Sequence, residues 1–392
     1  MSDKSHFATL AVHAGEAPDR LTGALDTPIY QSTTFVSVDS DDMAAVYGEE
    51  KPGFMYTRYG NPTLRALEQK VAALEGGEAA LATATGMAAI STAIMGYVKS
   101  GDHVVASRSL YGAAYNFLNK KLQRMGASTT FVASTQAEEL SKAIQPNTRL
   151  IYFESPSNPA LDIVDLAAVA RLGNERGIPT MIDNTFASPA LQQPISLGVT
   201  VVVHSATKYL CGHGDAMGGV IIGPEKYIYE LNHEVIRDFG GIISPFNAWL
   251  LLRGIRTLHV RMPVHCSNAQ LIADFLSKHP KVAHVNYPGL PTHPGHEIAA
   301  KQMKGFGAMI SFEAKGGYES GKKVMDGVKI FARAASLGDT RSLIVHSAST
   351  SHRAVPRDQR IAMGVSDGLV RLSIGIEAVE DLIADLDGAL NF

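Results

Sequence analysis

One lysine stands where a buried strand should end. The segment HSATKYLCGHGD, from His204 to Asp215, directly follows the apolar run at 201–203. Lysine is seldom fully buried without a partner, so Lys208 suggests either covalent chemistry or a side chain that extends to solvent. Taken alone, Lys208 fits a surface lysine that leaves a strand.

An acidic residue at the end of the preceding strand shifts the interpretation of Lys208 from a surface lysine toward covalent chemistry. Asp183 closes the segment TMID, and Ser205 closes VTVVVHS three residues before Lys208. Ligands of open α/β sheets bind beyond the carboxyl ends of the strands, so these side chains should meet there. A lysine amine, an acid for a pyridinium nitrogen and hydroxyls for a phosphate are what pyridoxal 5'-phosphate requires. The sequence therefore predicts that cofactor.

The segment ATATGMAAIST is a second candidate for binding the phosphate. Gly86 and Met87 would open a helix there, and the free N–H groups at a helix N-terminus bind anions. By itself, a helix that starts with small residues more often reflects close packing than phosphate binding. The glycines of GHGDAMGG precede a strand instead of following one, so a dinucleotide-binding loop is not predicted.

Strands and helices alternate through the middle of the chain. Six short apolar segments are separated by helix-like segments and begin at His103, Thr129, Leu150, Thr180, Val199 and Gly218. This alternation predicts an α/β fold with a parallel sheet and helices on both faces. The uncharged stretch Leu81–Val98 is predicted to be a helix packed inside the protein, because Thr, Ser and Gly residues interrupt it too often for a membrane span.

The pattern changes after Trp249. Residues 249–280 predict one long helix, and AMISFEAKGG, KIFARAASLG, SLIVHSA and LVRLSIGIE predict strands before a closing helix over Val379–Leu390. We expect an N-terminal arm over residues 1–60, a cofactor-binding domain over 61–258 and a smaller α+β domain over 259–392.

The composition is that of an ordinary globular protein. The 392 residues are 45% hydrophobic and 19% charged, with a formal net charge of −3, and no basic run indicates nucleic-acid binding. Cys211 and Cys266 have neither disulfide nor metal-ligand spacing, so no metal site is predicted and a cytoplasmic setting is expected. No signal peptide or membrane partner is expected.

Several segments together resemble the Cys/Met-metabolism family of pyridoxal-phosphate enzymes, the trans-sulfuration enzymes. They are YTRYGNPT, ATGM, ESPSNP, IDNTF, VVHSATKY and GLVRLSIGIE, and the similarity runs in order from His13 to Leu390. The resemblance implies a fold-type I transferase with a mostly parallel seven-stranded sheet and a smaller C-terminal domain. It also implies a homotetramer, built as a dimer of dimers, that acts on a small amino-acid substrate.

The resemblance further implies a role for each matching residue. Lys208 would bind the cofactor covalently, Asp183 would contact its pyridine nitrogen, and Tyr111 would stack on the ring and act as a general acid or base at the substrate's γ-substituent. Taken singly, Tyr111 fits a turn aromatic equally well. The cofactor phosphate would be bound by Gly86, Met87, Ser205 and Thr207 of the same subunit and by Tyr56 and Arg58 of a neighbouring subunit. The substrate carboxylate would be bound by Arg371, Asn158 and Ser336.

Two reactions of this family fit the sequence. GHGD, SPFNAWLLLRG, SLGD and the pair Arg237–Asp238 resemble the methionine γ-lyases, which carry a cysteine where this chain has Ala113. YGAAYN and HSASTSHRA favour the sulfhydrylases, and Ala335 lacks the acid that cystathionine γ-lyases place there. We expect α,γ-elimination to 2-oxobutanoate, ammonia and a thiol first. The alternative is γ-replacement, as in O-acylhomoserine sulfhydrylase or cystathionine γ-synthase. A cofactor carrier without turnover is disfavoured, because Lys208, Tyr111 and Arg371 are all present.

Overall fold

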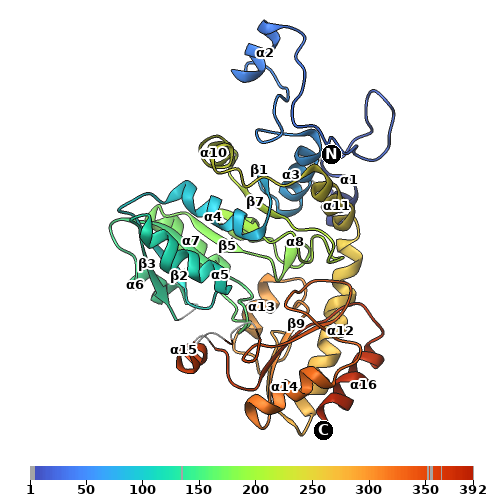
Figure 1. Cartoon of the computed structure of the whole chain (residues 1–392). Coiled ribbons are helices and arrows are strands. Elements are labelled where there is room, and N and C mark those ends of the chain that lie inside the picture. Colours follow the sequence, from blue (N-terminus) through green and yellow to red (C-terminus); the bar gives the residue numbers. More distant parts are fainter. Residues whose placement is uncertain (1–4, 134–135, 351–352, 354–355, 363, 392) are drawn as a thin grey trace.

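The structure is a computed structural model that describes residues 5–133, 136–350, 353, 356–362 and 364–391. Two β-sheets organise the chain, a large one in the upper part of Figure 1 and a small one in the lower part. The strands of the large sheet are β1 (Ala79–Thr83), β2 (His103–Ser107), β3 (Ser128–Val132), β4 (Thr148–Glu154), β5 (Thr180–Asp183), β6 (Val201–His204) and β7 (Gly219–Gly223). The strands of the small sheet are β8 (Val282–Asn286), β9 (Met309–Ala314), β10 (Ala332–Arg333), β11 (Leu343–His346) and β12 (Leu369–Ser373).

The large sheet has the order β1-β7-β6-β5-β4-β2-β3. The neighbours from β6 through β3 are parallel, whereas β7 is antiparallel to both β1 and β6. This arrangement confirms the predicted seven-stranded, mostly parallel sheet. Asp183 of β5 pairs with Val203 of β6, so the acid and the segment that leads to Lys208 leave the sheet side by side.

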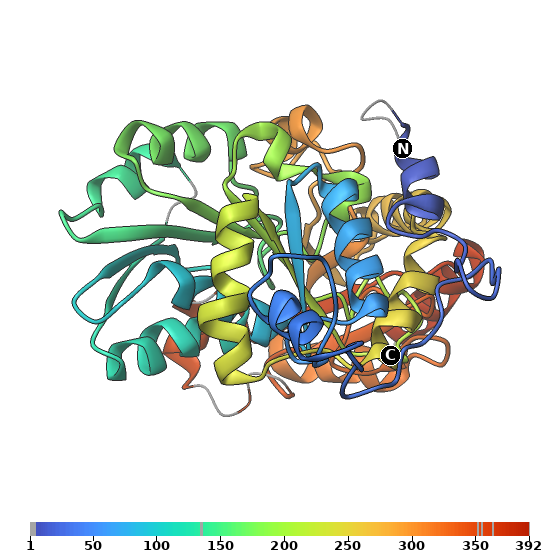
Figure 2. The same cartoon turned by 90° about the horizontal axis from the view of Figure 1, so that it is seen from above.

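Helices cover both faces of the large sheet, as the alternating pattern predicted (Figure 2). The strands are buried on both sides: Val201 and Val203 pack against the helices of one face, and Val202 packs against those of the other. The first face is covered by α4 (Gly86–Tyr97), α5 (Gly112–Asn116), η1 (Phe117–Leu122), α9 (Glu225–Glu230), η3 (Leu231–Ile236) and α10 (Arg237–Phe239). The second face is covered by α3 (Pro62–Glu75), α6 (Ala137–Lys142), α7 (Leu166–Arg176), α8 (Ser188–Leu191), η2 (Pro194–Leu197) and α11 (Pro245–Ile255).

The small sheet has the order β10-β11-β12-β9-β8, and its strands are antiparallel except for the pair β10 and β11. Its apolar side chains join the same core as α3 and α7, so one continuous core extends through both sheets. Its helices are α12 (Leu258–Lys278), α13 (His296–Gln302), α14 (Gly317–Gly327), α15 (Arg357–Ala362) and α16 (Val379–Leu390). Within the described residues, no helix has the length and apolar character needed to cross a membrane.

Two helix predictions were wrong in their extent. The stretch Leu81–Val98 is not one helix, because β1 occupies its start and α4 begins only after Thr85, whose hydroxyl accepts a hydrogen bond from the N–H of Ala88. Residues 249–280 form two helices, which break after Ile255. The guanidinium of Arg261 satisfies the carbonyl of Gly254 at this break (2.9 Å), a contact that the hydrophobic pattern does not reveal.

Two strand predictions also need correction. The segment KIFARAASLG contributes only the two-residue strand β10, and its following residues turn toward Lys208 instead of extending. Strand β8 was not predicted, because it is an edge strand in which only Val282 and Val285 are buried. The closing helix α16 covers the predicted residues 379–390.

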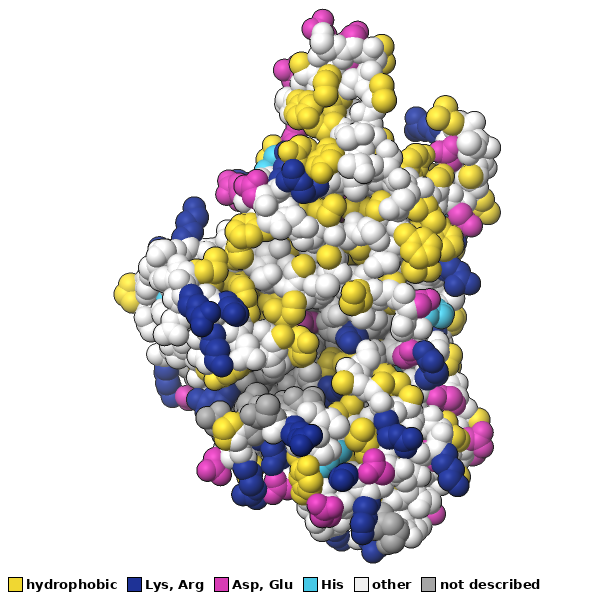
Figure 3. Space-filling model, viewed as in Figure 1, with side chains coloured by type: hydrophobic (Ala, Val, Ile, Leu, Met, Phe, Trp, Pro, Cys, Tyr) yellow, Lys and Arg dark blue, Asp and Glu magenta, His cyan; other side chains and the backbone are white. Residues whose placement is uncertain are grey.

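Residues 5–60, the described part of the predicted arm, contribute few side chains to the core, with Ala11, Ala14 and Val46 as their buried apolar residues. The helices of the arm are α1 (Phe7–His13) and α2 (Ser40–Tyr47), and Figure 1 shows α2 projecting well away from both sheets. Apolar side chains gather on this projection in Figure 3, and Val36 and Val38 are at least 90% exposed. Exposed apolar surface of this kind marks an interaction site. The boundaries after residues 60 and 258 stay predictions.

Candidate active site

A cavity of about 350 Å³ lies where β4, β5 and β6 end. The loop before β11 and strand β12 close it from the side of the small sheet. Ten of the predicted site residues line this cavity: Gly86, Met87, Tyr111, Asn158, Asp183, Ser205, Thr207, Lys208, Ser336 and Arg371. Residues from seven separate parts of the sequence therefore meet in one place.

Lys208 reaches the cavity from the turn after β6. Its ammonium nitrogen Nζ donates a hydrogen bond to Ser336 Oγ (2.9 Å). Burial, with a smaller contribution from the charge of Arg371, lowers the pKa of Lys208. A larger fraction of this amine is therefore neutral at pH 7 than for a surface lysine, which favours a nucleophile or a base.

Close backbone packing holds Lys208 in this position. Gly338 has φ +72°, and a Cβ placed on it would lie 2.6 Å from the backbone nitrogen of Tyr209. Arg261 donates to the carbonyl of Tyr209 from the other side (2.9 Å). Only glycine permits this approach of the Ser336 loop to the Lys208 turn.

Two carboxyl groups end neighbouring strands at the cavity. Asp183, 9% exposed, accepts hydrogen bonds at Oδ1 from the N–H (2.9 Å) and hydroxyl (2.5 Å) of Thr185. Burial raises the pKa of Asp183, although the Thr185 contacts oppose this effect. Burial and the nearby charge of Asp183 raise the pKa of Glu154. The pair therefore favours one shared proton, and Glu154 is the side chain more inclined to hold it.

The N-terminus of α4 points into the same cavity. The N–H groups of Gly86 and Met87 lie in its first turn, where helices have no internal acceptors. A Cβ on Gly86 would stand 2.6 Å from Cβ of Ser205, so glycine lets the start of α4 approach Ser205 this closely. Thr207 also lines the cavity, but its hydroxyl already exchanges hydrogen bonds with the backbone of Gly218. Free N–H groups and the helix dipole make this end an anion site.

Arg371 is a partly buried cation without an acidic neighbour in the described part of the chain. Its guanidinium donates to Asn158 Oδ1 (2.9 Å) and to the carbonyl of Ser336 (3.3 Å), and no ion pair involves it. Burial lowers the pKa of Arg371 to about 10, so the side chain remains charged at pH 7. A guanidinium held this way needs an anion from a ligand, and its planar fork suits a carboxylate.

Tyr111 begins α5 at the open side of the cavity. Its backbone N–H donates to Glu154 Oε1 (2.7 Å), while its side chain is 46% exposed. The contact with Glu154 fixes the backbone of Tyr111. The hydroxyl of the Tyr111 side chain remains able to approach a ligand. Ala113 lies in the same short helix and does not line the cavity of this chain.

Tyr56 and Arg58 lie in the arm, outside the cavity of their own chain. The Arg58 guanidinium stacks over the rings of Tyr56 (5.3 Å) and Tyr59 (5.1 Å). Part of the segment HSASTSHRA, residues 351–352 and 354, lies outside the described residues.

Several cavity residues escaped the sequence analysis. Glu154 ends a buried strand as Asp183 does, so the rule that identified Asp183 could have found it. Thr185 lies two residues beyond Asp183, and its hydroxyl also accepts from the N–H of Ser205 (2.8 Å). The apolar lining residues Ile90, Phe186 and Leu337 carry no signal that separates them from core residues.

A seven-stranded, mostly parallel sheet with a lysine, an acid and an anion site at its strand ends defines a fold-type I pyridoxal-phosphate enzyme. Residues 8–391 match the family described as Cys/Met metabolism PLP-dependent enzyme, and the chain belongs to this family. The predicted family, cofactor and fold class are thereby confirmed. The protein is an enzyme of sulfur amino-acid metabolism that depends on pyridoxal phosphate.

Three relatives match nearly the whole chain. The L-methionine gamma-lyase of Fusobacterium nucleatum subsp. nucleatum is 47% identical over 389 residues, which cover 99% of this chain and 98% of that protein. The L-methionine gamma-lyase of Porphyromonas gingivalis is 47% identical over 390 residues, with the same coverage. The O-acetyl-L-homoserine sulfhydrylase of Leptospira meyeri is 41% identical over 423 residues and covers 97% of this chain and 96% of that protein.

Two solved structures superpose closely. That of metB from Corynebacterium glutamicum gives a TM-score of 0.94 at 44% identity, covering 100% of this chain and 99% of that one. That of metY from Campylobacter jejuni subsp. jejuni gives 0.94 at 34% identity, covering 99% and 100%. The metY structure contains N'-pyridoxyl-lysine-5'-monophosphate, a lysine joined to the cofactor.

The cavity residues of this chain fit pyridoxal phosphate. The free N–H groups at the start of α4, which Gly86 allows to lie close to Ser205, suit the phosphate. Lys208 offers an amine, and Asp183 offers a carboxylate for the ring nitrogen. When bound, the cofactor supplies an electrophilic carbon and an electron sink for a carbanion at the substrate Cα.

Proposed function

We propose that the protein catalyses α,γ-elimination on methionine and related γ-substituted amino acids, releasing 2-oxobutanoate, ammonia and a thiol. The partly buried guanidinium of Arg371, which has no acidic partner among the described residues, carries this proposal, because it calls for a ligand carboxylate beside Lys208. The two methionine γ-lyases at 47% identity support elimination as the reaction.

The proposed roles follow from the positions of the side chains. Arg371 and Asn158 would bind the α-carboxylate and so present the Cα proton to Lys208. Lys208, whose pKa burial lowers, would take this proton and later help to move one from Cβ. The hydroxyl of Ser336 would keep the amine directed into the cavity (2.9 Å). Tyr111, at the open side, would donate a proton to the departing γ-substituent.

The wall near Ser336 supports a small or apolar γ-substituent. Ala335 and Leu337 both line the cavity there, and Ile90 and Phe186 add further apolar surface. None of these side chains could bind a second charged amino group. A methylthio group can transfer to such a wall without leaving a charge unpaired, whereas the distal amino acid of cystathionine cannot.

A second candidate is γ-replacement, in which an incoming thiol or sulfide takes the place of an acyl group on homoserine. Ala113, in the place of the cysteine of the methionine γ-lyases, favours it, and so does the 41% identical sulfhydrylase. Cystathionine γ-synthase chemistry is a variant of the same replacement. Elimination and replacement begin alike and diverge only when an acceptor arrives.

A product assay separates these two reactions. The purified enzyme would be given L-methionine, L-homocysteine, L-cystathionine or an O-acylhomoserine, each with and without sulfide. We expect 2-oxobutanoate and methanethiol from methionine. Formation of homocysteine from an O-acylhomoserine and sulfide, with methionine left intact, would replace elimination by the sulfhydrylase reaction.

We also propose a homotetramer built from dimers that share their cavities. The arm carries Arg58 and exposed apolar side chains but lies away from the cavity of its own chain. Its base is tied to α3 by Lys70 and Glu16 (2.9 Å), both buried, so the arm leaves the body in a fixed direction. Co-assembled Arg58→Ala and Lys208→Ala subunits should regain activity that neither variant has alone. A fully active monomer would contradict this assembly.

A further inference from the structure

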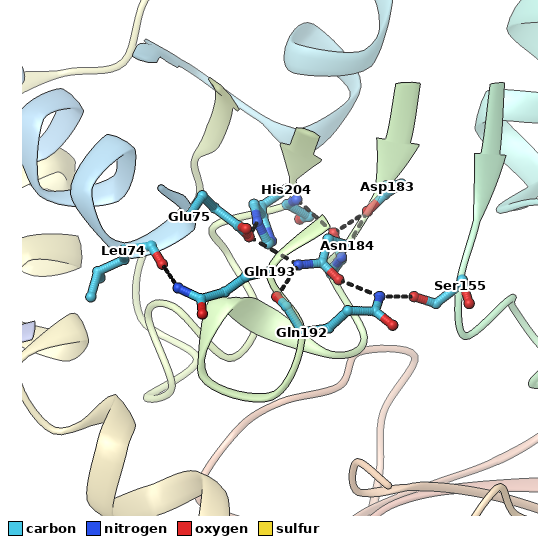
Figure 4. A network of polar contacts seen from close by, with 10 residues as sticks. Leu74, Glu75, Ser155, Asp183, Asn184, Gln192, Gln193 and His204 are labelled. Carbon is cyan, nitrogen blue, oxygen red and sulfur yellow. Dashed lines mark hydrogen bonds and ion pairs between the residues drawn. The ribbon is translucent and has the colours of Figure 1, made fainter. Parts of the chain in front are cut away.

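A polar network lies behind the cavity, on the face of the large sheet covered by α3 (Figure 4). It joins the last residue of α3, Glu75, to Asn184 after β5 and His204 at the end of β6. The residues next to them in sequence, Asp183 and Ser205, face the cavity. The network therefore holds the reverse side of the two strand ends that carry the candidate cofactor contacts.

Glu75 is the centre of this network. Its Oε1 lies 2.6 Å from His204 Nε2 and accepts a hydrogen bond from the amide of Asn184 (2.9 Å), and both Glu75 and His204 are 1% exposed. Its other oxygen, Oε2, has no hydrogen-bond partner among the described residues. Of the two side chains that contact the Glu75 carboxylate, only His204 can become positively charged. Buried carboxylates require such a partner.

The carboxylate that contacts His204 belongs to the C-terminal end of α3. Glu75 is the final residue of the helix, and Gly76 caps it with φ +72°. The carbonyl groups of a helix C-terminus carry partial negative charge, which stabilises a cation beside them. His204 therefore contacts a carboxylate that belongs to the last residue of a helix.

Asn184 transmits this arrangement to β5. Its amide nitrogen donates both to Glu75 and to the carbonyl of Gln192 (2.9 Å), and its amide oxygen accepts from Gln192 Nε2 (2.9 Å). Both amide hydrogens are used, so the side chain has one orientation. On the cavity side, the hydroxyl of Thr185 links Asp183 to the N–H of Ser205. The two strand ends are thus joined on both faces of the sheet.

We propose that Glu75 and His204 form a positioning pair, which fixes the strand ends that carry Asp183 and Ser205 and keeps the Asp183 carboxylate anionic toward the cofactor nitrogen. The inference rests on the proposed role of Asp183. Electrostatically, the pair should lower the pKa of Asp183. Burial raises this pKa, and a positive His204 is one of the groups that lower it. Neither residue touches the cavity, so both act through Asp183 and Ser205.

Uncharged variants of similar shape separate this role from simple support of the fold. Glu75→Gln and His204→Gln keep side chains that can form hydrogen bonds but remove the charges. The control is Gln193→Ala, because Gln193 contacts the same helix end through the carbonyl of Leu74 (2.6 Å) without touching His204 or Asn184. A purely structural network would change unfolding temperature in all three variants and leave the cofactor nitrogen unaffected.

The experiment measures the protonation state of the cofactor ring nitrogen directly. Each apoprotein would be reconstituted with pyridoxal 5'-phosphate labelled with ¹⁵N in the ring, whose chemical shift distinguishes pyridinium from pyridine, and cofactor Kd would be measured by fluorescence titration. We expect Glu75→Gln and His204→Gln to shift the nitrogen toward pyridine and to weaken binding about tenfold. Gln193→Ala should keep the pyridinium signal and the Kd.

A parallel Asp183→Asn variant separates the two possible failures. If it loses the pyridinium signal while Glu75→Gln and His204→Gln keep it, the pair has no electrostatic role and the inference is wrong, although the role of Asp183 stands. If Asp183→Asn also keeps the signal, the role of Asp183 itself is wrong. Should the charge variants fail to fold, the imidazole ¹⁵N shifts of His204 in the wild type decide, because a neutral His204 overturns the proposal.

Discussion

Replacing Arg371 by glutamine should weaken substrate binding while leaving the fold intact or more stable. The guanidinium can offer a substrate carboxylate two charge-assisted hydrogen bonds, each contributing about 1.5–3 kcal/mol. Glutamine can restore one weaker bond at most, so the loss should be roughly 3–4 kcal/mol. This corresponds to a decrease in kcat/KM of about two to three powers of ten.

The stability of the variant should change in the opposite direction. Burial lowers the pKa of Arg371 to about 10. The folded protein therefore binds this proton less tightly than the unfolded chain does, and the charged side chain destabilises the fold at neutral pH. The depression corresponds to roughly 3 kcal/mol, of which a neutral glutamine recovers part by removing the charge. Thermal unfolding of the ligand-free variant should occur at an equal or higher temperature.

The assay compares ligands with and without a carboxylate. Norleucine, which has the shape of methionine but no leaving group, and 3-(methylthio)propylamine, which lacks the carboxylate, would be titrated into wild type and Arg371→Gln. Only norleucine should lose affinity. Arg341→Gln is the matched control, because Arg341 lies in the same region but is exposed and paired with Asp339. An equal loss for both ligands would refute the carboxylate role of Arg371.

Three further predictions concern the cofactor and the choice of substrate. Lys208→Ala should lose turnover and the borohydride-reducible bond to the cofactor, and an adduct trapped on another lysine would contradict this. Gly86→Ala should weaken cofactor binding about tenfold, at a typical overpacking cost of 1–3 kcal/mol, because its Cβ would meet Ser205 at 2.6 Å; an unchanged Kd would show that the phosphate lies elsewhere. Ala113→Cys should raise kcat/KM for methionine relative to O-acetylhomoserine by about one to two powers of ten, and an unchanged ratio would remove this position from the specificity argument.

The strand ends could be predicted from the sequence because two simple rules apply to them. Apolar runs such as 201–203 predict buried strands, and the polar residues that follow, Asp183 and Ser205, then share one edge of the sheet. The prediction that Gly86 and Met87 open a helix agrees with the start of α4, whereas the prediction of one helix over Leu81–Val98 missed β1, because strand and helix there are both apolar and uncharged. Only Thr85, an ordinary N-cap residue, marks the boundary.

The parts of the site that the sequence could not predict depend on contacts across large sequence separations. Nothing near Glu75 indicates that its carboxylate meets His204, 129 residues later. The same holds for Lys208 and Ser336, which are 128 residues apart. Burial decides the charge states of such groups, and burial is a property of the folded chain. The family resemblance supplied Arg371 and Ser336, which periodicity alone would have left on an ordinary strand and loop.

The charges in the cavity support the proposal that a neighbouring subunit completes the site. Lys208 and Arg371 are the two cationic residues that line it in the described part of the chain. A covalent bond to the cofactor would occupy the first, and the substrate carboxylate would occupy the second. A phosphate group carries roughly −1.5 to −2 charges at neutral pH, whereas the N-terminus of α4 offers only about half a positive charge. The phosphate therefore needs a further cation, and Arg58 on the projecting arm of a neighbouring subunit is the residue that we propose to supply it.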